Sequence, residues 1–234
     1  MIDFHSHILP GIDDGSQSVE ESLQLLEALR KQRVDTVVAS SHYDASRYSP
    51  RHFLEKRAYV FRKLLKALPA ERPEILLGAE VLYFPGLSRV AALRELCIEG
   101  TDVLLLEMPF GSWTEYMVRE VLELARSGEF TVLLAHVERY QTRQNRPFWD
   151  RLLADGVLMQ SNADFFLSFF TRGRALRMLE SGYIHLLGTD CHNMTSRPPR
   201  MAEGRRAIRD KLGKRALREI DELGETLLDG AVGR

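Results

Sequence analysis

The chain has 234 residues, a formal net charge of -1, 44% hydrophobic residues and 28% charged residues. This ordinary globular balance argues against a nucleic-acid partner and against attraction to an anionic membrane, and no apolar run reaches membrane-spanning length. The two cysteines form neither a disulfide framework nor a CxxC metal knuckle. We therefore expect a cytoplasmic protein without membrane insertion, built as one domain over residues 1–234.

Seven apolar, β-rich segments alternate with helical patterns along the chain. Nearly continuous apolar runs such as 131–135 are typical of parallel strands that are buried on both faces. Seven strand–helix units would let a parallel sheet close, or nearly close, into a barrel, whereas an open doubly wound sheet is the alternative that the pattern leaves open. The predicted strands begin near Ile2, Val34, Ile75, Val103, Val132, Val157 and Ile184.

Helix starts are marked by capping residues. Residues 18–21 and 112–115 each read as a capping box, and Ser49 before Pro50 opens a helix that is expected to reach about Leu68. From Arg200 onward the chain is charged and helical, and we expect this part to pack outside the barrel. Shorter helices are predicted over 148–153 and 174–179.

The first predicted strand carries His5 and His7, which lie on the same face because side chains alternate along a strand. Two imidazoles held in this way can bind one cation. Asp13 and Asp14 follow in a glycine-containing loop and offer a carboxylate to the same site.

Other metal-ligating side chains stand at the carboxyl ends of the remaining predicted strands. In a parallel barrel these ends open on one face, where active sites are built. Mixed imidazole and carboxylate ligands suit Mn²⁺, Zn²⁺ or Fe²⁺. Their number exceeds one coordination shell and indicates two or three ions sharing a bridging carboxylate, an arrangement suited to phosphate-ester hydrolysis. The side chains are His5, His7, His42, Glu80, Glu107, His136, Asp190 and His192.

Six segments of the chain form a specific set: IDFHSHILPGIDDGS, SSHY, GAE, LLEMPF, LAHVERY and GTDCHNMTSRPP. Together they resemble the PHP (polymerase and histidinol phosphatase) superfamily and, within it, the CpsB-like tyrosine-protein phosphatases of bacterial capsular and exopolysaccharide loci. The resemblance covers almost the whole chain. It implies a PHP-type distorted (β/α)7 barrel and metal-dependent hydrolysis of phosphotyrosine in proteins. The implied substrate is an autophosphorylating bacterial tyrosine kinase that controls polysaccharide synthesis.

The resemblance also implies three metal sites, with Mn²⁺ expected and Zn²⁺, Fe²⁺ or Mg²⁺ as alternatives, and two arginines at the site, Arg139 and Arg197. Spacing does not decide between Asp13 and Asp14, and the family pattern favours Asp14. Relatives usually read Thr-Pro-His-His where this chain has residues 40–43 as Ser-Ser-His-Tyr, so a second histidine is absent there. The implied ligand sets are His5, His7, Glu80 and Asp190; Glu80, Glu107 and His136; and Asp14, His42 and His192.

In the implied reaction a deprotonated water between the ions attacks phosphorus, and the ions and arginines neutralise the phosphoryl oxygens. Two alternatives remain open: a small-molecule phosphatase such as histidinol phosphatase, and a metal-binding regulatory module without turnover. Cys191 and Arg197 also show the Cys-x5-Arg spacing of cysteine-dependent phosphatases. The segment between them lacks glycine and two prolines follow it, so we prefer the metal mechanism.

Supporting roles are expected for other residues near the strand ends. Glu138 is predicted to form a local ion pair with Arg139, and Asn162 and Asp164 are predicted to hydrogen-bond behind the ligands. The aromatic segment 165–170 is expected to pack in a helix and the core rather than to line a docking surface.

Overall fold

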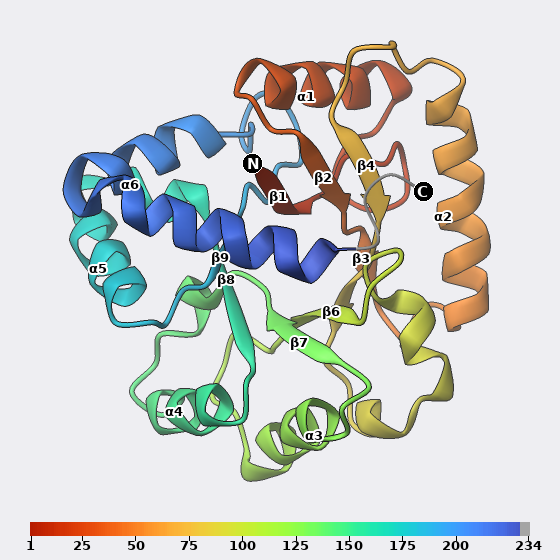
Figure 1. The fold of residues 1–234 in the computed structure, drawn as a ribbon. Helices are drawn as coiled ribbons and strands as arrows, with labels where there is room; N and C mark the ends of the chain where they lie inside the picture. Colours follow the sequence, from red (N-terminus) through yellow and green to blue (C-terminus); the bar gives the residue numbers. More distant parts are fainter. Residues whose placement is uncertain (230–234) are drawn as a thin grey trace.

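The computed structural model describes residues 1–229, so residues 230–234 of the expected domain lie outside the described part. Parallel strands curl into a partly closed barrel with helices around it (Figure 1). The strands are β1 (Ile2–Ser6), β2 (Thr36–Ala39), β3 (His42–Tyr43), β4 (Glu74–Leu77), β5 (Glu80–Leu82), β6 (Val103–Glu107), β7 (Thr131–Leu134), β8 (Leu158–Asn162) and β9 (Leu186–Gly188). The α-helices are α1 (Val19–Lys31), α2 (Pro50–Leu65), α3 (Glu115–Arg126), α4 (Arg146–Ala154), α5 (Phe169–Glu180) and α6 (Met201–Leu228). The 3-10 helices are η1 (Leu87–Arg89), η2 (Ala91–Leu96), η3 (Val137–Tyr140) and η4 (Ala163–Phe166).

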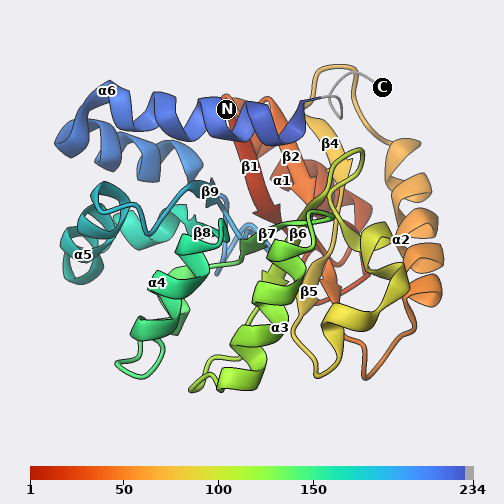
Figure 2. The same cartoon turned by 60° about the horizontal axis from the view of Figure 1, so that its bottom comes forward.

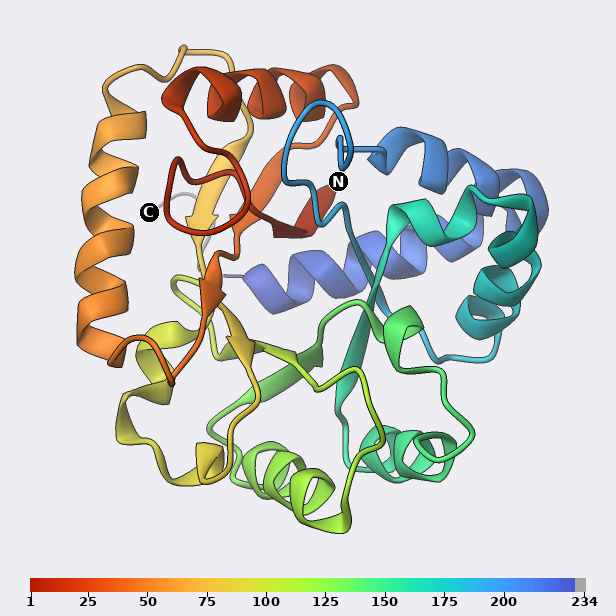
Figure 3. The ribbon, with the colours of Figure 1, turned by 180° about the vertical axis from the view of Figure 1, so that it is seen from behind.

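The strands form two parallel sheets, ordered β1-β2-β4 and β3-β5-β6-β7-β8-β9. The first and last strands meet at an isolated parallel bridge between Ser6 and Cys191. Backbone hydrogen bonds from Asp190 N to His5 O (2.7 Å) and from His7 N to Cys191 O (2.9 Å) reinforce this junction. Figure 3 shows the resulting ring of strands from behind. The predicted barrel class is thereby confirmed, in the form of a curled parallel sheet.

Two of the seven predicted strand regions are each broken into two short strands. The second region becomes β2 and β3, and the third becomes β4 and β5, with breaks at residues 40–41 and 78–79. At the first break, Ser40 bonds to β1: its N–H donates to Ser6 O (2.9 Å) and its Oγ accepts from Ser6 N (3.0 Å). The chain then turns to pair with the second sheet. As a result His42 and Glu80 begin new strands, opposite each other in register, rather than ending long ones.

Helix caps explain where most helices begin. Ser18 accepts a hydrogen bond from Glu21 N and Ser49 from His52 N, as predicted. The prediction that Ser112 caps the third helix is wrong, because Thr114 accepts from Met117 N and caps α3 instead. Ser112 Oγ is engaged with the side chain of Gln144 in a neighbouring loop. The helix after Ser49 ends at Leu65, slightly before the expected end.

Helix α6 crosses the amino-terminal ends of the strands (Figure 2). Its first part packs against η4, and its last turn brings the buried Leu228 to a core cluster that contains Phe4 and Leu133. This end of the barrel is therefore covered by helix, and the opposite, carboxyl-terminal end is available for a site. Within residues 1–229, no helix is long and apolar enough to cross a membrane.

The aromatic segment 165–170 behaves only partly as expected. Phe165 and Phe166 are buried in the core, but Phe169 and Phe170 are 84% and 89% exposed. The prediction of core packing is wrong for this second pair. They form the first turn of α5, directly after the cap Ser168, where their side chains face solvent.

Candidate metal centre

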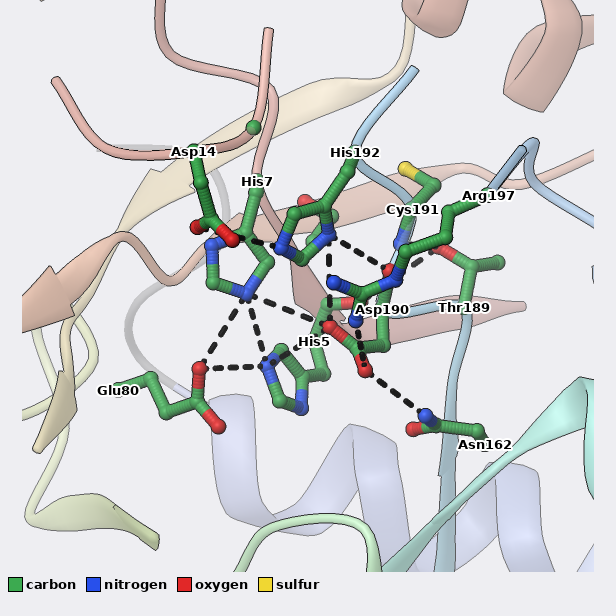
Figure 4. Close-up of polar contacts among 12 residues, drawn as sticks. His5, His7, Asp14, Glu80, Asn162, Thr189, Asp190, Cys191, His192 and Arg197 are labelled. Carbon is green, nitrogen blue, oxygen red and sulfur yellow. Dashed lines mark hydrogen bonds and ion pairs between the residues drawn. The ribbon is translucent and has the colours of Figure 1, made fainter. Parts of the chain in front are cut away.

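All nine predicted ligands converge at the carboxyl-terminal ends of the strands, and most are labelled in Figure 4. His5 lies in β1, His42 in β3 and Glu80 in β5, and Glu107 ends β6. The other ligands occupy the loops that immediately follow a strand. Neighbouring strands in parallel register bring these positions together although they are far apart in the sequence. The residues that lie in loops are His7, Asp14, His136, Asp190 and His192.

A first group of donor atoms faces a common point. His5 Nε2 lies 3.1 Å from His7 Nε2, 3.1 Å from Glu80 Oε2 and 3.6 Å from Asp190 Oδ1. His7 Nε2 lies 3.3 Å from the same Glu80 oxygen and 3.4 Å from the same Asp190 oxygen. These four side chains are almost completely buried. Buried nitrogen and oxygen donors that crowd one point in this way fit a divalent cation.

A second group shares Glu80 through its other oxygen. His136 Nε2 lies 2.7 Å from Glu80 Oε1 and 3.4 Å from Glu107 Oε1. Glu80 thus presents one oxygen to each group, as a carboxylate that bridges two cations does. Its Oε2 is buried and is approached by His42 Nδ1 (2.9 Å), His5 Nε2 (3.1 Å) and His7 Nε2 (3.3 Å), but none of these contacts within residues 1–229 has the geometry of a hydrogen bond. A cation among these atoms would satisfy them together.

A third group contains Asp14, whose Oδ1 lies 3.3 Å from His42 Nε2 and 3.4 Å from His192 Nε2. His192 Nε2 is another buried atom without a partner in the described residues. The three sites adjoin closely, because donor atoms from different sets also lie within 4.8 Å of one another, one atom from each residue. These overlapping groups are His7, Asp14, His42 and His192; His5, His7 and Asp190; and His42, Glu80 and Glu107.

The two neighbouring aspartates have separate roles. Asp13 Oδ2 accepts from His42 N (3.0 Å) and lies 2.9 Å from His7 Nδ1, and its Oδ1 accepts from Gly15 N (3.0 Å). Both oxygens of Asp13 are therefore engaged. The bond to Nδ1 orients the His7 ring so that Nε2 faces the first group, a common carboxylate–histidine arrangement in metal sites. Asp14 is left as the loop carboxylate that faces the imidazoles.

Two arginines flank the ligand groups, as the sequence predicts. Asp190 Oδ2 accepts hydrogen bonds from Arg197 Nη2 (2.5 Å), Arg139 Nη2 (2.6 Å) and Asn162 Nδ2 (2.9 Å). The other oxygen of Asp190 faces His5 and His7, so one carboxylate connects the imidazoles to both guanidinium groups. Arg139 and Arg197 remain about one-third exposed, at 35% and 37%, and an anion from solvent can reach them.

Gln160 was not identified from the sequence, but it supports several ligands from β8. Its Oε1 accepts from His136 N (2.8 Å) and lies 3.2 Å from His5 Nδ1. Its Nε2 donates to Asn162 Oδ1 (3.0 Å), and Asn162 donates in turn to Asp190. The predicted supporting role of Asn162 is thus confirmed. In the sequence, Gln160 begins the polar run Gln-Ser-Asn at the carboxyl end of β8, and this position at a strand end was the only signal that could have marked it.

Close backbone approach and unusual backbone angles hold this arrangement together. A Cβ on Gly188 would lie 2.5 Å from His5 Cβ, so only glycine lets β9 come this near to β1. His136 and Asp190 adopt left-handed backbone, with φ of 32° and 53°. Such conformations cost about 1–3 kcal/mol for residues other than glycine and are maintained at functional sites.

The charges of the centre are mutually compensated. Burial alone would lower the pKa of His7, but the carboxylates of Asp13, Asp190 and Glu80 together outweigh burial and raise it well above its usual value. Burial also opposes the shift at His136, whose pKa is raised to about 9 by Glu107 and Glu80. Burial would raise the pKa of Glu80, but the surrounding imidazoles hold it well below its usual range. In the absence of metal the positive charge that faces the carboxylates therefore comes from protonated imidazoles. Bound divalent ions would displace these protons and supply the charge instead, because an imidazole must be neutral to ligate a metal.

Two residues near the ligands do not have the roles that their sequence positions suggest: Cys191 is not a nucleophile, and Glu138 does not pair with Arg139. Burial, followed by the nearby Asp3 carboxylate, raises the pKa of the Cys191 thiol to about 12, so it is not an activated thiolate. The predicted Glu138–Arg139 ion pair is wrong. Arg139 turns to Asp190, and the half-buried Glu138 instead accepts a hydrogen bond from Asn162 N (3.1 Å).

Cavities open on two sides of the ligand cluster. One of about 400 Å³ is lined by Asp14, His42 and Glu107 together with Tyr48. The other, of about 330 Å³, is lined by Asp190 and by both arginines. A ligand can therefore approach the cluster from the face that carries the guanidinium groups.

Comparison with known proteins agrees with this geometry. A family model for capsular polysaccharide synthesis proteins, CpsB/CapC, matches residues 1–223. The tyrosine-protein phosphatase CpsB of Streptococcus pneumoniae is 31% identical over 232 residues, covering 94% of each chain. The tyrosine-protein phosphatase YwqE of Bacillus subtilis is 27% identical and covers 97% of this chain and 91% of its own.

Among solved structures, the fold matches one from a study of YwqE of Bacillus subtilis and CpsB of Streptococcus pneumoniae, described as metal-dependent tyrosine phosphatases. The TM-score is 0.84 at 24% identity, and the match covers 98% of this chain and 95% of that chain. At this identity the match supports the fold, including the order of its strands and helices.

Proposed function

The chain belongs to the CpsB/CapC family of capsular polysaccharide synthesis, and from this premise we propose that it is a metal-dependent phosphatase acting on phosphotyrosine in proteins. The observation that carries the proposal is the convergence of eight imidazole and carboxylate side chains, joined by His136 through Glu80 and Glu107, beside two accessible arginines. The names of the relatives agree with this reaction. An autophosphorylating bacterial tyrosine kinase of polysaccharide synthesis is the substrate we propose. A cytoplasmic location remains a prediction.

We assign the ligands to two or three divalent cations, with Mn²⁺ as the preferred ion. The buried Oε2 of Glu80 and Nε2 of His192 support this assignment, because neither atom forms a hydrogen bond within residues 1–229 although each faces other ligand atoms. Mixed imidazole and carboxylate donors also fit Mn²⁺ chemistry. The proposed sets are His5, His7, Glu80 and Asp190; Glu80, Glu107 and His136; and Asp14, His42 and His192.

The residues of the chain then have distinct tasks. When bound, the cations supply Lewis acidity and lower the pKa of water at the site. Arg139 and Arg197, held together on Asp190 Oδ2, bind two phosphoryl oxygens and neutralise charge as the ester bond breaks. The departing phenolate of tyrosine is a comparatively stable anion, so the site needs no strong general acid.

Removal of metal tests the proposal directly. Protein treated with a chelator and freed of it should not hydrolyse phosphotyrosine peptides, and added Mn²⁺ should restore hydrolysis. Parallel assays with histidinol phosphate distinguish the small-molecule alternative, and no turnover with any substrate and ion would favour the regulatory module. Full activity in metal-stripped protein would refute the metal mechanism.

The two arginines allow a second test. Arg139→Ala and Arg197→Ala should each lower kcat/KM for a phosphotyrosine peptide by about 10²-fold or more, because a charge-stabilising donor is lost. Bound metal, measured by elemental analysis, should stay near the wild-type stoichiometry. Arg172→Ala, in α5, is a control that should leave both quantities unchanged. Loss of metal in either arginine variant would show that the residue organises the ligands and does not bind phosphate.

A further inference from the structure

We propose that Phe110 is the surface on which the aromatic ring of the substrate packs, so that this residue makes the site prefer aryl phosphates to alkyl phosphates. The inference rests on the proposed function and adds a determinant of substrate class to it. Phe110 lies outside the ligand sets and is three residues beyond Glu107, in the loop that follows β6.

The Phe110 ring combines exposure with contact to the site. It is 56% exposed, although it is a large apolar side chain. Its centroid lies 5.8 Å from the guanidinium carbon of Arg139 and 5.9 Å from the His136 ring. An exposed phenylalanine beside a proposed phosphate-binding arginine gives an apolar surface at the point where the organic part of a bound phosphate ester would extend out of the ligand cluster.

Buried neighbours hold the ring in place. Phe110 stacks on Tyr140, with centroids 6.2 Å apart and planes inclined by 26°. The Tyr140 hydroxyl accepts a hydrogen bond from Met108 N (3.0 Å), and Trp113 Nε1 donates to Pro109 O (3.0 Å). The loop is thus fixed on both sides of Phe110. A fixed ring loses little conformational entropy when a ligand packs on it, so it is suited to recognition.

The distances agree with the size of the substrate. A phosphoryl oxygen bound by Arg139 lies about 3 Å from a guanidinium nitrogen. In phosphotyrosine the ring is one ester oxygen away from phosphorus, and aromatic rings interact at centroid separations of about 4.5–7 Å. A phenyl ester held by Arg139 therefore brings its ring within reach of Phe110. A phosphoserine offers only a methylene group at this position and gains no ring contact.

Binding of two inert phosphonates tests the inference. Benzylphosphonate carries a ring at the distance found in phosphotyrosine, and methylphosphonate carries none. Titration calorimetry with Mn²⁺-loaded protein should show tighter binding of benzylphosphonate to the wild type. Phe110→Ala and Phe110→Leu should weaken benzylphosphonate binding by about threefold to tenfold, the range for loss of an aromatic pair, and leave methylphosphonate binding unchanged. Phe110→Trp should retain the preference.

Tyr59→Ala is the matched control, because Tyr59 is also an exposed ring (54%) with a nearby cation, Lys63 Nζ at 4.4 Å, but lies on α2. It should change neither affinity. Unchanged benzylphosphonate binding in Phe110→Ala, or an equal loss for both ligands, would overturn the inference. Because neither phosphonate is hydrolysed, the result does not depend on turnover. A ring preference that requires Phe110, in a protein that hydrolyses no phosphotyrosine, would refute the proposed function and leave the ring contact standing.

Discussion

At the scale of single residues, similar side chains do different work because their partners differ. Asp13 and Asp14 are adjacent, but Asp13 bonds His7 Nδ1 and two backbone N–H groups while Asp14 faces His42 and His192. One orients a ligand and the other is positioned to be one. Gln160 and Glu80 differ in the same way. Gln160 contacts His5 Nδ1 and orients a ligand, whereas Glu80 faces the first two ligand groups and is positioned to be a ligand itself.

Gln160 provides a test of this supporting layer. Gln160→Leu removes the acceptor of His136 N and the partner of His5 Nδ1. The His5 ring then loses the bond that orients it, and Mn²⁺ affinity should fall by about 10- to 100-fold, the usual effect of losing such a partner.

Titration calorimetry with Mn²⁺ measures the effect, and Gln24→Leu on the exposed face of α1 is the control. A purely structural role for Gln160 would lower the melting temperature while leaving the Mn²⁺ affinity of the folded protein at the wild-type value.

His185 lies away from the ligand groups, and we expect its titration to make the stability of the folded protein depend on pH. Burial between β8 and β9 lowers its pKa below the usual 6.5. The unfolded chain therefore binds a proton at a pH where the folded protein does not, and stability should fall as the pH drops below about 6.5, by at most about 1.4 kcal/mol per pH unit for this group. Above that pH its contribution should be constant.

Urea unfolding of the metal-free protein between pH 5 and 8 checks this effect. His185→Gln, which does not titrate, should show a smaller loss of stability on acidification, and His52→Gln, in an exposed position on α2, should behave as the wild type. Identical pH profiles for His185→Gln and the wild type would contradict the prediction.

At the scale of elements, the contact between α6 and η4 depends on the absence of a side chain. A Cβ on Gly204 would lie 2.6 Å from Ala163 O and 2.8 Å from Ala163 Cβ. Because the obstructing atoms include backbone, α6 would have to move. Gly204→Ala should therefore destabilise the protein by about 1–3 kcal/mol, as overpacking of a close contact does.

Denaturant unfolding measures this loss. Gly173→Ala is the control, since Gly173 is in α5 and a Cβ there meets only Arg177 Nη1 at 3.6 Å. That substitution should leave stability unchanged or increase it by up to about 1 kcal/mol, because alanine favours helix. A neutral Gly204→Ala would show that α6 can shift freely against η4.

At the scale of the whole molecule, closure between the first and last strands makes the site. The hydrogen bonds that join residues 5–7 to residues 190–191 place His5 and His7 beside Asp190 and His192. The other ligands arrive from β3, β5 and β6 and from the loops after β1 and β7. The centre therefore exists only when the ring of strands is complete, and each bound cation would connect distant parts of the chain.

The sequence by itself determined the alternation of strands and helices, the barrel class, the family and the residues that would meet at the strand ends. These follow from local patterns: buried strands are apolar, capping residues mark most helix starts, and a His-x-His pair needs only strand geometry to share a face. Such patterns describe one segment at a time, so they are visible without a fold.

Only the tertiary structure decided how those residues divide their work. The break after β2, the Thr114 cap, the separate roles of Asp13 and Asp14, the support from Gln160 and the exposed position of Phe110 depend on partners elsewhere in the chain. His5 and Gln160 are 155 positions apart. Which atoms of two such residues meet depends on strand register and on closure of the barrel, because a shift of one residue turns every side chain of a strand to the opposite face.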